Sequence, residues 1–114
     1  MFQYSSIREL NWAFQQNILT PIELTEAIFK KANQVDAGIL LDTFETRALK
    51  EAEASTQRWQ EQETLGLFDG IPCVWKDLFD IKDSVTTAGS QAYQNQPKAF
   101  LDAPIVTAYK KCGG

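Results

Sequence analysis

Histidine is absent from this 114-residue sequence, and its absence narrows the chemistry that the chain can perform. Catalysis by Ser–His–Asp or Cys–His groups needs an imidazole base, so a site built by this chain alone uses neither. The commonest zinc ligand is missing as well, and neither a metal nor another cofactor is implied. Any general base supplied by this chain is therefore a lysine, a carboxylate or, less favourably, a tyrosine.

Long hydrophobic runs and basic clusters are also missing. No apolar stretch approaches the ~20 residues that a membrane-spanning helix needs. The N-terminus lacks the basic start and apolar core of a signal peptide, so we expect a cytoplasmic protein with no membrane partner. The net charge is −4, and basic residues adjoin only at Lys30-Lys31 and Lys110-Lys111, which argues against a nucleic-acid partner.

Cysteine is scarce. Cys73 and Cys112 lie far apart in the sequence and form no metal-binding pattern. Cytosolic thiols stay reduced, so we predict two free thiols and expect both to be buried.

Capping signals followed by apolar residues at helical spacing predict several helices. Ser6 and Glu9 form a capping box, and Thr20 precedes a proline at the first helical position. The predicted helices span 6–16, 21–34 and 45–61, and a last helix begins at 102–104. The short apolar segment 38–41 is either a strand or an extended link.

The segment Ile71 to Trp75 is apolar, follows a turn signal at Asp69-Gly70 and tolerates a proline near its start, so we predict a buried strand. The residues from 77 to 97 have a loop-like composition. One strand does not make a sheet, so its pairing partners are missing or come from outside these residues.

Lys76 ends this apolar segment, and Asp77 and Asp80 follow it. A buried lysine is costly unless its charge is used or removed. Two interpretations are open. A neutral amine takes a proton from a serine hydroxyl, as in serine–lysine hydrolases, or the lysine reaches solvent or pairs with Asp77 or Asp80. The spacing alone favours the second interpretation, in which the lysine reaches solvent or pairs with an acid.

Other nucleophiles are weaker candidates. Cys73 lies three residues before Lys76, and on a strand two such side chains point to opposite faces. Hydroxyl residues follow in the loop, where they stabilise turns or line a polar site wall. They are Ser84, Thr86, Thr87 and Ser90. Gly89 permits positive φ or close backbone approach.

The run from Gly70 to Asp77 resembles a motif of the amidase signature family, Gly-Ile-Pro-x-x-x-Lys-Asp. Gly70, Ile71, Pro72, Lys76 and Asp77 match it position for position. The segment 86–90, Thr-Thr-Ala-Gly-Ser, looks like the segment that follows in the family, and 102–104 looks like the start of its next helix. The resemblance covers nearly the whole chain.

This resemblance implies an α/β fold, in which N-terminal helices and the first strands belong to a mixed sheet covered by helices. Residues 1–114 would then be the N-terminal portion of an amidase domain, truncated before the Gly-Ser-Ser-Gly segment, and the fold would be incomplete. Lys76 would be the catalytic base of a Ser–Ser–Lys triad, largely buried in the complete fold. The parent enzyme would hydrolyse a small-molecule amide without cofactor or metal, or transfer its acyl group to ammonia, and the substrate-binding residues are unknown.

Two expectations follow for the chain by itself. It is inactive, because no Gly-Ser-Ser-Gly segment occurs in its sequence and the catalytic serines are therefore absent. It also self-associates through an exposed strand and apolar helix faces. The alternative function is a non-catalytic interaction or self-associating module derived from an amidase, without turnover of its own.

Overall fold

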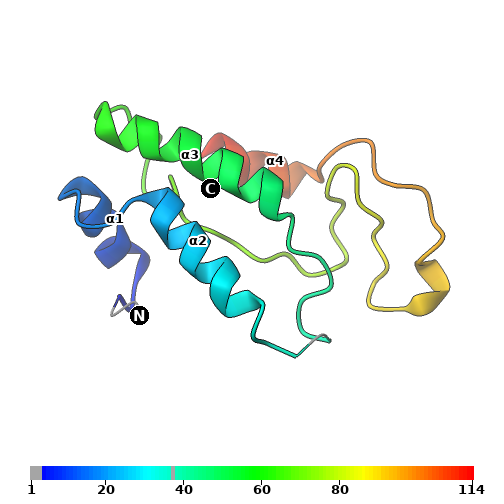
Figure 1. Cartoon of the computed structure of the whole chain (residues 1–114). Coiled ribbons are helices and arrows are strands. Elements are labelled where there is room, and N and C mark those ends of the chain that lie inside the picture. The colour runs from blue at the N-terminus through cyan, green and yellow to red at the C-terminus, as the bar shows by residue number, and fades with distance from the viewer. Residues whose placement is uncertain (1–3, 37) are drawn as a thin grey trace. The chain divides into compact units, whose positions relative to one another are not determined.

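The computed structural model describes residues 4–36 and 38–114. These residues form four α-helices, labelled in Figure 1, and one 3₁₀ turn: α1 (Ile7–Gln15), α2 (Pro21–Ala32), α3 (Glu45–Gln60), η1 (Gln91–Tyr93) and α4 (Pro104–Lys111). The chain divides into two compact units. The first unit is Met1–Pro72 with Cys112–Gly114, and the second unit is Cys73–Lys111.

The predicted α/β fold class is wrong for the described residues, which contain helices, turns and coil but no β-strand. The predicted buried strand Ile71 to Trp75 is coil. Ile71 donates its N–H to the Phe68 carbonyl within a turn, and Val74 is 77% exposed. A strand is held by hydrogen bonds to a neighbouring extended segment, and no described segment pairs with this one. Segment 38–41 forms turns and bends rather than a strand.

The capping signals were interpreted correctly at the first two helices. The Glu9 N–H donates to the Ser6 hydroxyl at 3.1 Å, and the Glu23 N–H donates to the Thr20 hydroxyl at 3.2 Å. Each bond satisfies a backbone donor that the helix itself leaves unpaired. α3 begins differently, since its N-cap Phe44 is left-handed, with φ 48°, and gives no side-chain cap. The predicted helices agree with the observed bounds to within a few residues.

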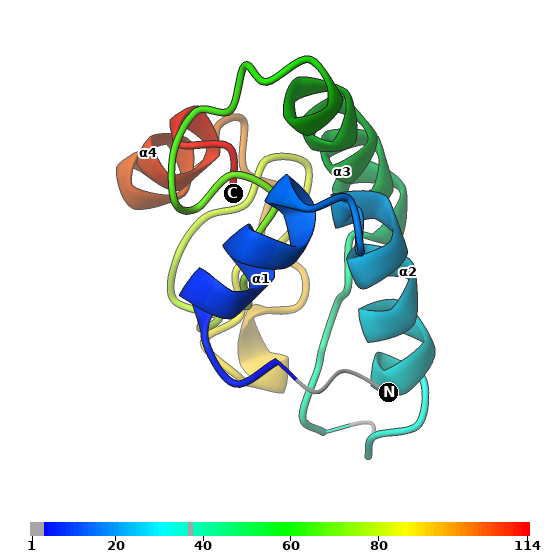
Figure 2. The ribbon, with the colours of Figure 1, turned by 90° about the vertical axis from the view of Figure 1, so that its left-hand side faces the viewer.

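In the first unit α2 and α3 lie side by side (Figure 1), and Figure 2 shows α1 on the near side of the pair. The core of this unit is a cluster of buried apolar side chains: Ala13, Phe14, Leu19, Leu24 and Ile71. The ring of Trp59 on α3 packs against Phe14 with centroids 5.6 Å apart. Ile71 therefore joins the core that the helices form, although it belongs to no strand.

In the second unit the backbone following Lys76 runs alongside the segment that leads into α4. The Asp83 N–H donates to the Ala99 carbonyl at 2.9 Å, and the Ala103 N–H donates to the Asp80 carbonyl at 2.8 Å. Ile81 and Val106 are the buried apolar residues of this unit. In the described part of the chain, no helix has the length and apolar character needed to cross a membrane.

Candidate functional site

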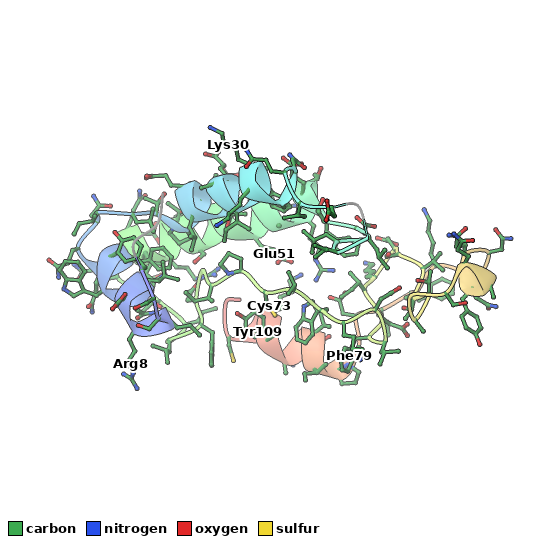
Figure 3. The ribbon with its side chains drawn as sticks, turned by 90° about the horizontal axis from the view of Figure 1, so that it is seen from below. Arg8, Lys30, Glu51, Cys73, Phe79 and Tyr109 are labelled. Atoms are coloured by element: carbon green, nitrogen blue, oxygen red, sulfur yellow. The ribbon has the colours of Figure 1, made fainter. Side chains whose placement is uncertain are left out.

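Lys76 lies at a tight turn of the second unit. Its carbonyl oxygen accepts hydrogen bonds from the Leu78 N–H at 2.7 Å and the Phe79 N–H at 3.3 Å. The preceding ring, Trp75, packs edge-on against Phe79 and against Tyr109 of α4, each at 5.9 Å between centroids. Phe79 and Tyr109 are labelled in Figure 3. The Lys76 side chain is exposed. The backbone of Lys76 is therefore held in place by hydrogen bonds, whereas its side chain is accessible to solvent.

The two carboxylates that follow Lys76 bind threonines. Asp77 Oδ2 accepts from the Thr87 N–H at 3.0 Å and from the Thr87 hydroxyl. Asp80 Oδ1 accepts from the Thr86 hydroxyl at 2.7 Å. Within the described residues Lys76 forms an ion pair with neither acid. The pairing of Lys76 with Asp77 or Asp80 is therefore not seen, whereas the exposure of Lys76 agrees with the other branch of that interpretation, in which the lysine reaches solvent.

The loop prediction for 77–97 is confirmed apart from the short turn η1. Gly89 adopts positive φ, 72°, as its residue type suggested. Ser90 accepts from the Ala92 N–H and so caps η1. The hydroxyls of Thr86, Thr87 and Ser90 therefore serve turn and carboxylate contacts, and those of Thr86 and Thr87 reach the segment that carries Lys76.

Cys73 and Cys112 are free thiols, as predicted, but both are exposed rather than buried. The Cys73 thiol donates to the Val74 carbonyl at 3.4 Å. Although the residue is exposed, neighbouring atoms cover part of its sulfur, and this loss of water raises the pKa of the Cys73 thiol. A raised pKa disfavours the thiolate, which argues further against Cys73 as a nucleophile.

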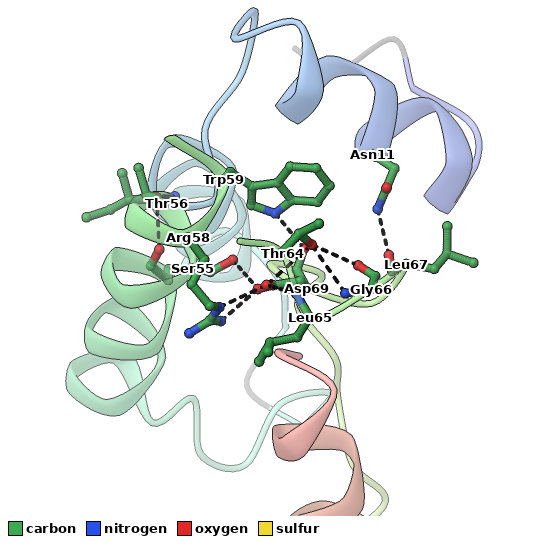
Figure 4. A network of polar contacts seen from close by, with 12 residues as sticks. Asn11, Ser55, Thr56, Arg58, Trp59, Thr64, Leu65, Gly66, Leu67 and Asp69 are labelled. Carbon is green, nitrogen blue, oxygen red and sulfur yellow. Dashed lines mark hydrogen bonds and ion pairs between the residues drawn. The ribbon is translucent and has the colours of Figure 1, made fainter. Parts of the chain in front are cut away.

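A polar network around Asp69 in the first unit was missed from sequence. Figure 4 shows the fully buried carboxylate accepting from Ser55 Oγ at 2.6 Å and from the Leu65 N–H at 2.9 Å. Arg58 donates from Nε at 2.8 Å and from Nη2 at 2.7 Å. The Trp59 indole N–H donates to the Asp69 carbonyl at 3.1 Å. These bonds fix the residue directly before Gly70.

The charges of this network compensate one another. Burial by itself would raise the pKa of Asp69, but hydrogen bonds from Arg58, Ser55 and the Leu65 N–H, with the attraction of the Arg58 charge, hold that pKa below its ordinary value. The hydrogen bond to Asp69 in turn raises the pKa of Arg58. The Arg58 side chain is 27% exposed, so this arginine is partly withdrawn from solvent by its contact with Asp69. One available signal was its spacing from Ser55, three residues along the same helix face.

Two glycines lie where a larger residue does not fit. A Cβ on Gly70 would lie 2.7 Å from Pro21 Cγ and 2.8 Å from Ser55 Oγ, and one on Gly113 would lie 2.6 Å from Asp69 Cγ. The Gly70 N–H also donates to the Gly113 carbonyl at 2.9 Å. The glycine of the Gly-Ile-Pro motif is thus required by close packing inside the first unit.

Comparison with known proteins agrees with the motif. The model of the family described as Amidase matches residues 23–114. A mitochondrial glutamyl-tRNA(Gln) amidotransferase subunit of Homo sapiens is 38% identical over 109 residues, covering 93% of this chain and 20% of the relative. The fatty acid amide hydrolase of Medicago truncatula is 31% identical over 117 residues, covering 98% of this chain and 19% of the relative.

A bacterial relative, the corresponding glutamyl-tRNA(Gln) amidotransferase subunit of Herminiimonas arsenicoxydans, is 30% identical over 108 residues, covering 95% of this chain and 22% of the relative. The chain spans about a fifth of the length of the curated relatives that it matches. The family match extends over most of the chain and includes the segment with Lys76 and its two threonine-bound acids. This chain therefore belongs to the amidase family.

Proposed function

We propose that this chain forms the N-terminal portion of an amidase domain and supplies Lys76 as the base for cleavage of an amide bond. The observation that carries the proposal is the family match over 23–114, which includes the Lys-Asp motif. The local geometry supports it. Lys76 is exposed at a fixed turn, and the two acids beside it are bound to threonines rather than to its ammonium.

In the proposed reaction the neutral Lys76 amine accepts a proton from a bridging serine, which accepts one from a second serine. The oxygen of that second serine attacks the amide carbonyl carbon and forms a C–O bond. The C–N bond then breaks, the nitrogen leaves with a proton returned through the bridging serine, and an acyl-enzyme ester remains. Water attacks the ester, the carboxylic acid is released and the serine regains its proton.

The substrate of the proposed reaction is a small-molecule amide. One relative is named as part of an amidotransferase and another as an amide hydrolase, so amide chemistry is common to both names. The sequence contains no Gly-Ser-Ser-Gly segment, and we propose that a further segment of polypeptide supplies both serines. The 114 residues alone are then inactive, since their sequence contains no serine segment whose hydroxyls Lys76 could activate.

The test uses the polypeptide encoded by an open reading frame that contains these residues and continues into a serine segment. It is called the full-length polypeptide below. Lys76→Ala is expected to lower kcat for amide hydrolysis at least about a thousandfold, in the range seen when an essential member of a catalytic group is lost. Lys82→Ala, which alters an exposed lysine in the same unit, is the matched control and is expected to leave kcat unchanged. Normal turnover by Lys76→Ala would overturn the proposal.

A second candidate is an interaction or self-associating module without turnover. The observation that favours it is the exposure of large apolar side chains in the second unit: Val74 at 77%, Phe100 at 90% and Leu101 at 74%. Apolar surface of this kind is typical of a region that another polypeptide covers. A stop codon directly after Gly114 in the genomic DNA would favour this candidate over the enzyme.

A further inference from the structure

We propose that Asp77 and Thr87 are positioning residues that hold the Lys76 turn in the geometry its amine needs. This inference rests on the proposed function of Lys76 as a base. It concerns residues that do not themselves touch the reacting atoms but fix the backbone from which the base extends.

The contact between the two residues joins parts of the loop ten positions apart. A single carboxylate oxygen, Asp77 Oδ2, accepts from both the backbone N–H and the hydroxyl of Thr87. The Gly89 N–H points to the same oxygen at 3.5 Å. Hydrogen bonds to a charged acceptor are about twice as strong as neutral ones, so this carboxylate ties the residue next to Lys76 to the 87–89 turn.

The turn itself is fixed on both sides of this contact. At its far end the Asp80 carboxylate binds the Thr86 hydroxyl at 2.7 Å. On the near side of Lys76, the Trp75 ring packs against both Phe79 and Tyr109. Both sequence neighbours of Lys76 are thus held in place, Trp75 by its ring contacts and Asp77 by its bonds to Thr87.

Position matters more than contact energy for a catalytic base. Proton transfer needs the amine within hydrogen-bond reach of a hydroxyl, and a misplacement of about 1 Å costs on the order of a hundredfold in rate. Loosening the turn would therefore lower kcat while leaving substrate affinity largely unchanged, because the amine acts on the serine rather than on the substrate.

The experiment compares a pair of Thr87 variants in the full-length polypeptide. Thr87→Val keeps the shape of the side chain but removes the hydroxyl, and is expected to lower kcat at least about tenfold with KM unchanged. Thr87→Ser restores the hydroxyl and is expected to recover kcat to within about twofold of the parent. Asp77→Ala is expected to lose about a hundredfold in kcat. Asp83→Asn, an exposed acid at positive φ that asparagine also tolerates, is the control and is expected to change nothing.

A second measurement does not depend on catalysis. In the 114-residue chain, amide hydrogen exchange of Thr87 is expected to accelerate at least about tenfold in Asp77→Asn and to stay unchanged in Asp83→Asn. Equal exchange in both variants, or equal kcat in Thr87→Val and Thr87→Ser, would overturn this inference even if Lys76→Ala is inactive. Full turnover by Lys76→Ala would overturn it together with the proposed function, so the two failures are distinguishable.

Discussion

Arg58 and Asp69 form a two-point ion pair in which one partner is fully buried. The guanidinium reaches both carboxylate oxygens, with Nε at 2.8 Å from Oδ2 and Nη2 at 2.7 Å from Oδ1. The Asp69 side chain is 0% exposed and that of Arg58 is 27% exposed. The arginine therefore brings a positive charge from the edge of the first unit to a carboxylate that has no access to water.

Removing that charge should destabilise the first unit. Arg58→Ala leaves a buried carboxylate without its cation, and we expect a loss of about 3 kcal/mol in the free energy of unfolding. Urea denaturation followed by far-UV circular dichroism measures it. Arg8→Ala is the matched control, since Arg8 is exposed and extends away from α1 in Figure 3. We expect a change below about 0.5 kcal/mol there. Equal midpoints for the two variants would contradict this role of Arg58.

The same network predicts how stability depends on pH. The pKa of Asp69 is lowered in the folded chain from its ordinary value of 3.8. A lowered folded pKa means that the unfolded chain binds this proton first, so the contribution of Asp69 is complete above about pH 4 and declines as the pH falls through the folded pKa. Unfolding curves measured between about pH 7 and pH 2 should show this acid-dependent loss. In Asp69→Asn the loss should be smaller, and an unchanged acid dependence would count against the assignment.

Gly70→Ala tests the close packing at the Gly-Ile-Pro motif. The new methyl group would lie 2.7 Å from Pro21 Cγ at a position with φ 83°, so both overpacking and backbone strain oppose it. We expect a loss of about 2 kcal/mol or more in unfolding free energy. Gly38→Ala is the control, because no atom from elsewhere in the chain lies within 4 Å of the added methyl. If the thermal midpoint falls equally in both variants, close packing at Gly70 is not the cause of the lost stability.

Self-association of the 114-residue chain is expected at micromolar concentration. Phe100 and Leu101 are 90% and 74% exposed, and pairing between copies would remove this apolar surface from water. Light scattering should therefore report a species larger than a monomer, and Phe100→Ser with Leu101→Ser should shift it toward the monomer. Lys98→Ser, an exposed polar position two residues away, should leave the size unchanged. A monomeric parent chain would rule this surface out as the cause of association.

The helices could be predicted because their signals are local. Ser6 and Thr20 cap helices through bonds that span three residues, and the apolar residues at helical spacing include Phe14 and Leu24, which are buried in the structure. The predicted strand failed for the opposite reason. The apolar composition from Ile71 to Trp75 is compatible with a buried strand. Strand formation also needs a second segment to pair with, and the local sequence does not specify that segment.

The sequence by itself determined the family, the helix positions and Lys76 as the proposed base, because motif spacing and capping residues are readable along the chain. Only the tertiary structure decided that Asp77 and Asp80 bind Thr87 and Thr86 rather than Lys76. It also decided that Asp69 is buried against Arg58 and Ser55. The physical reason is that a carboxylate binds whichever donor the fold brings within about 3 Å, and for Asp69 one such donor, Ser55, lies fourteen residues away in the sequence.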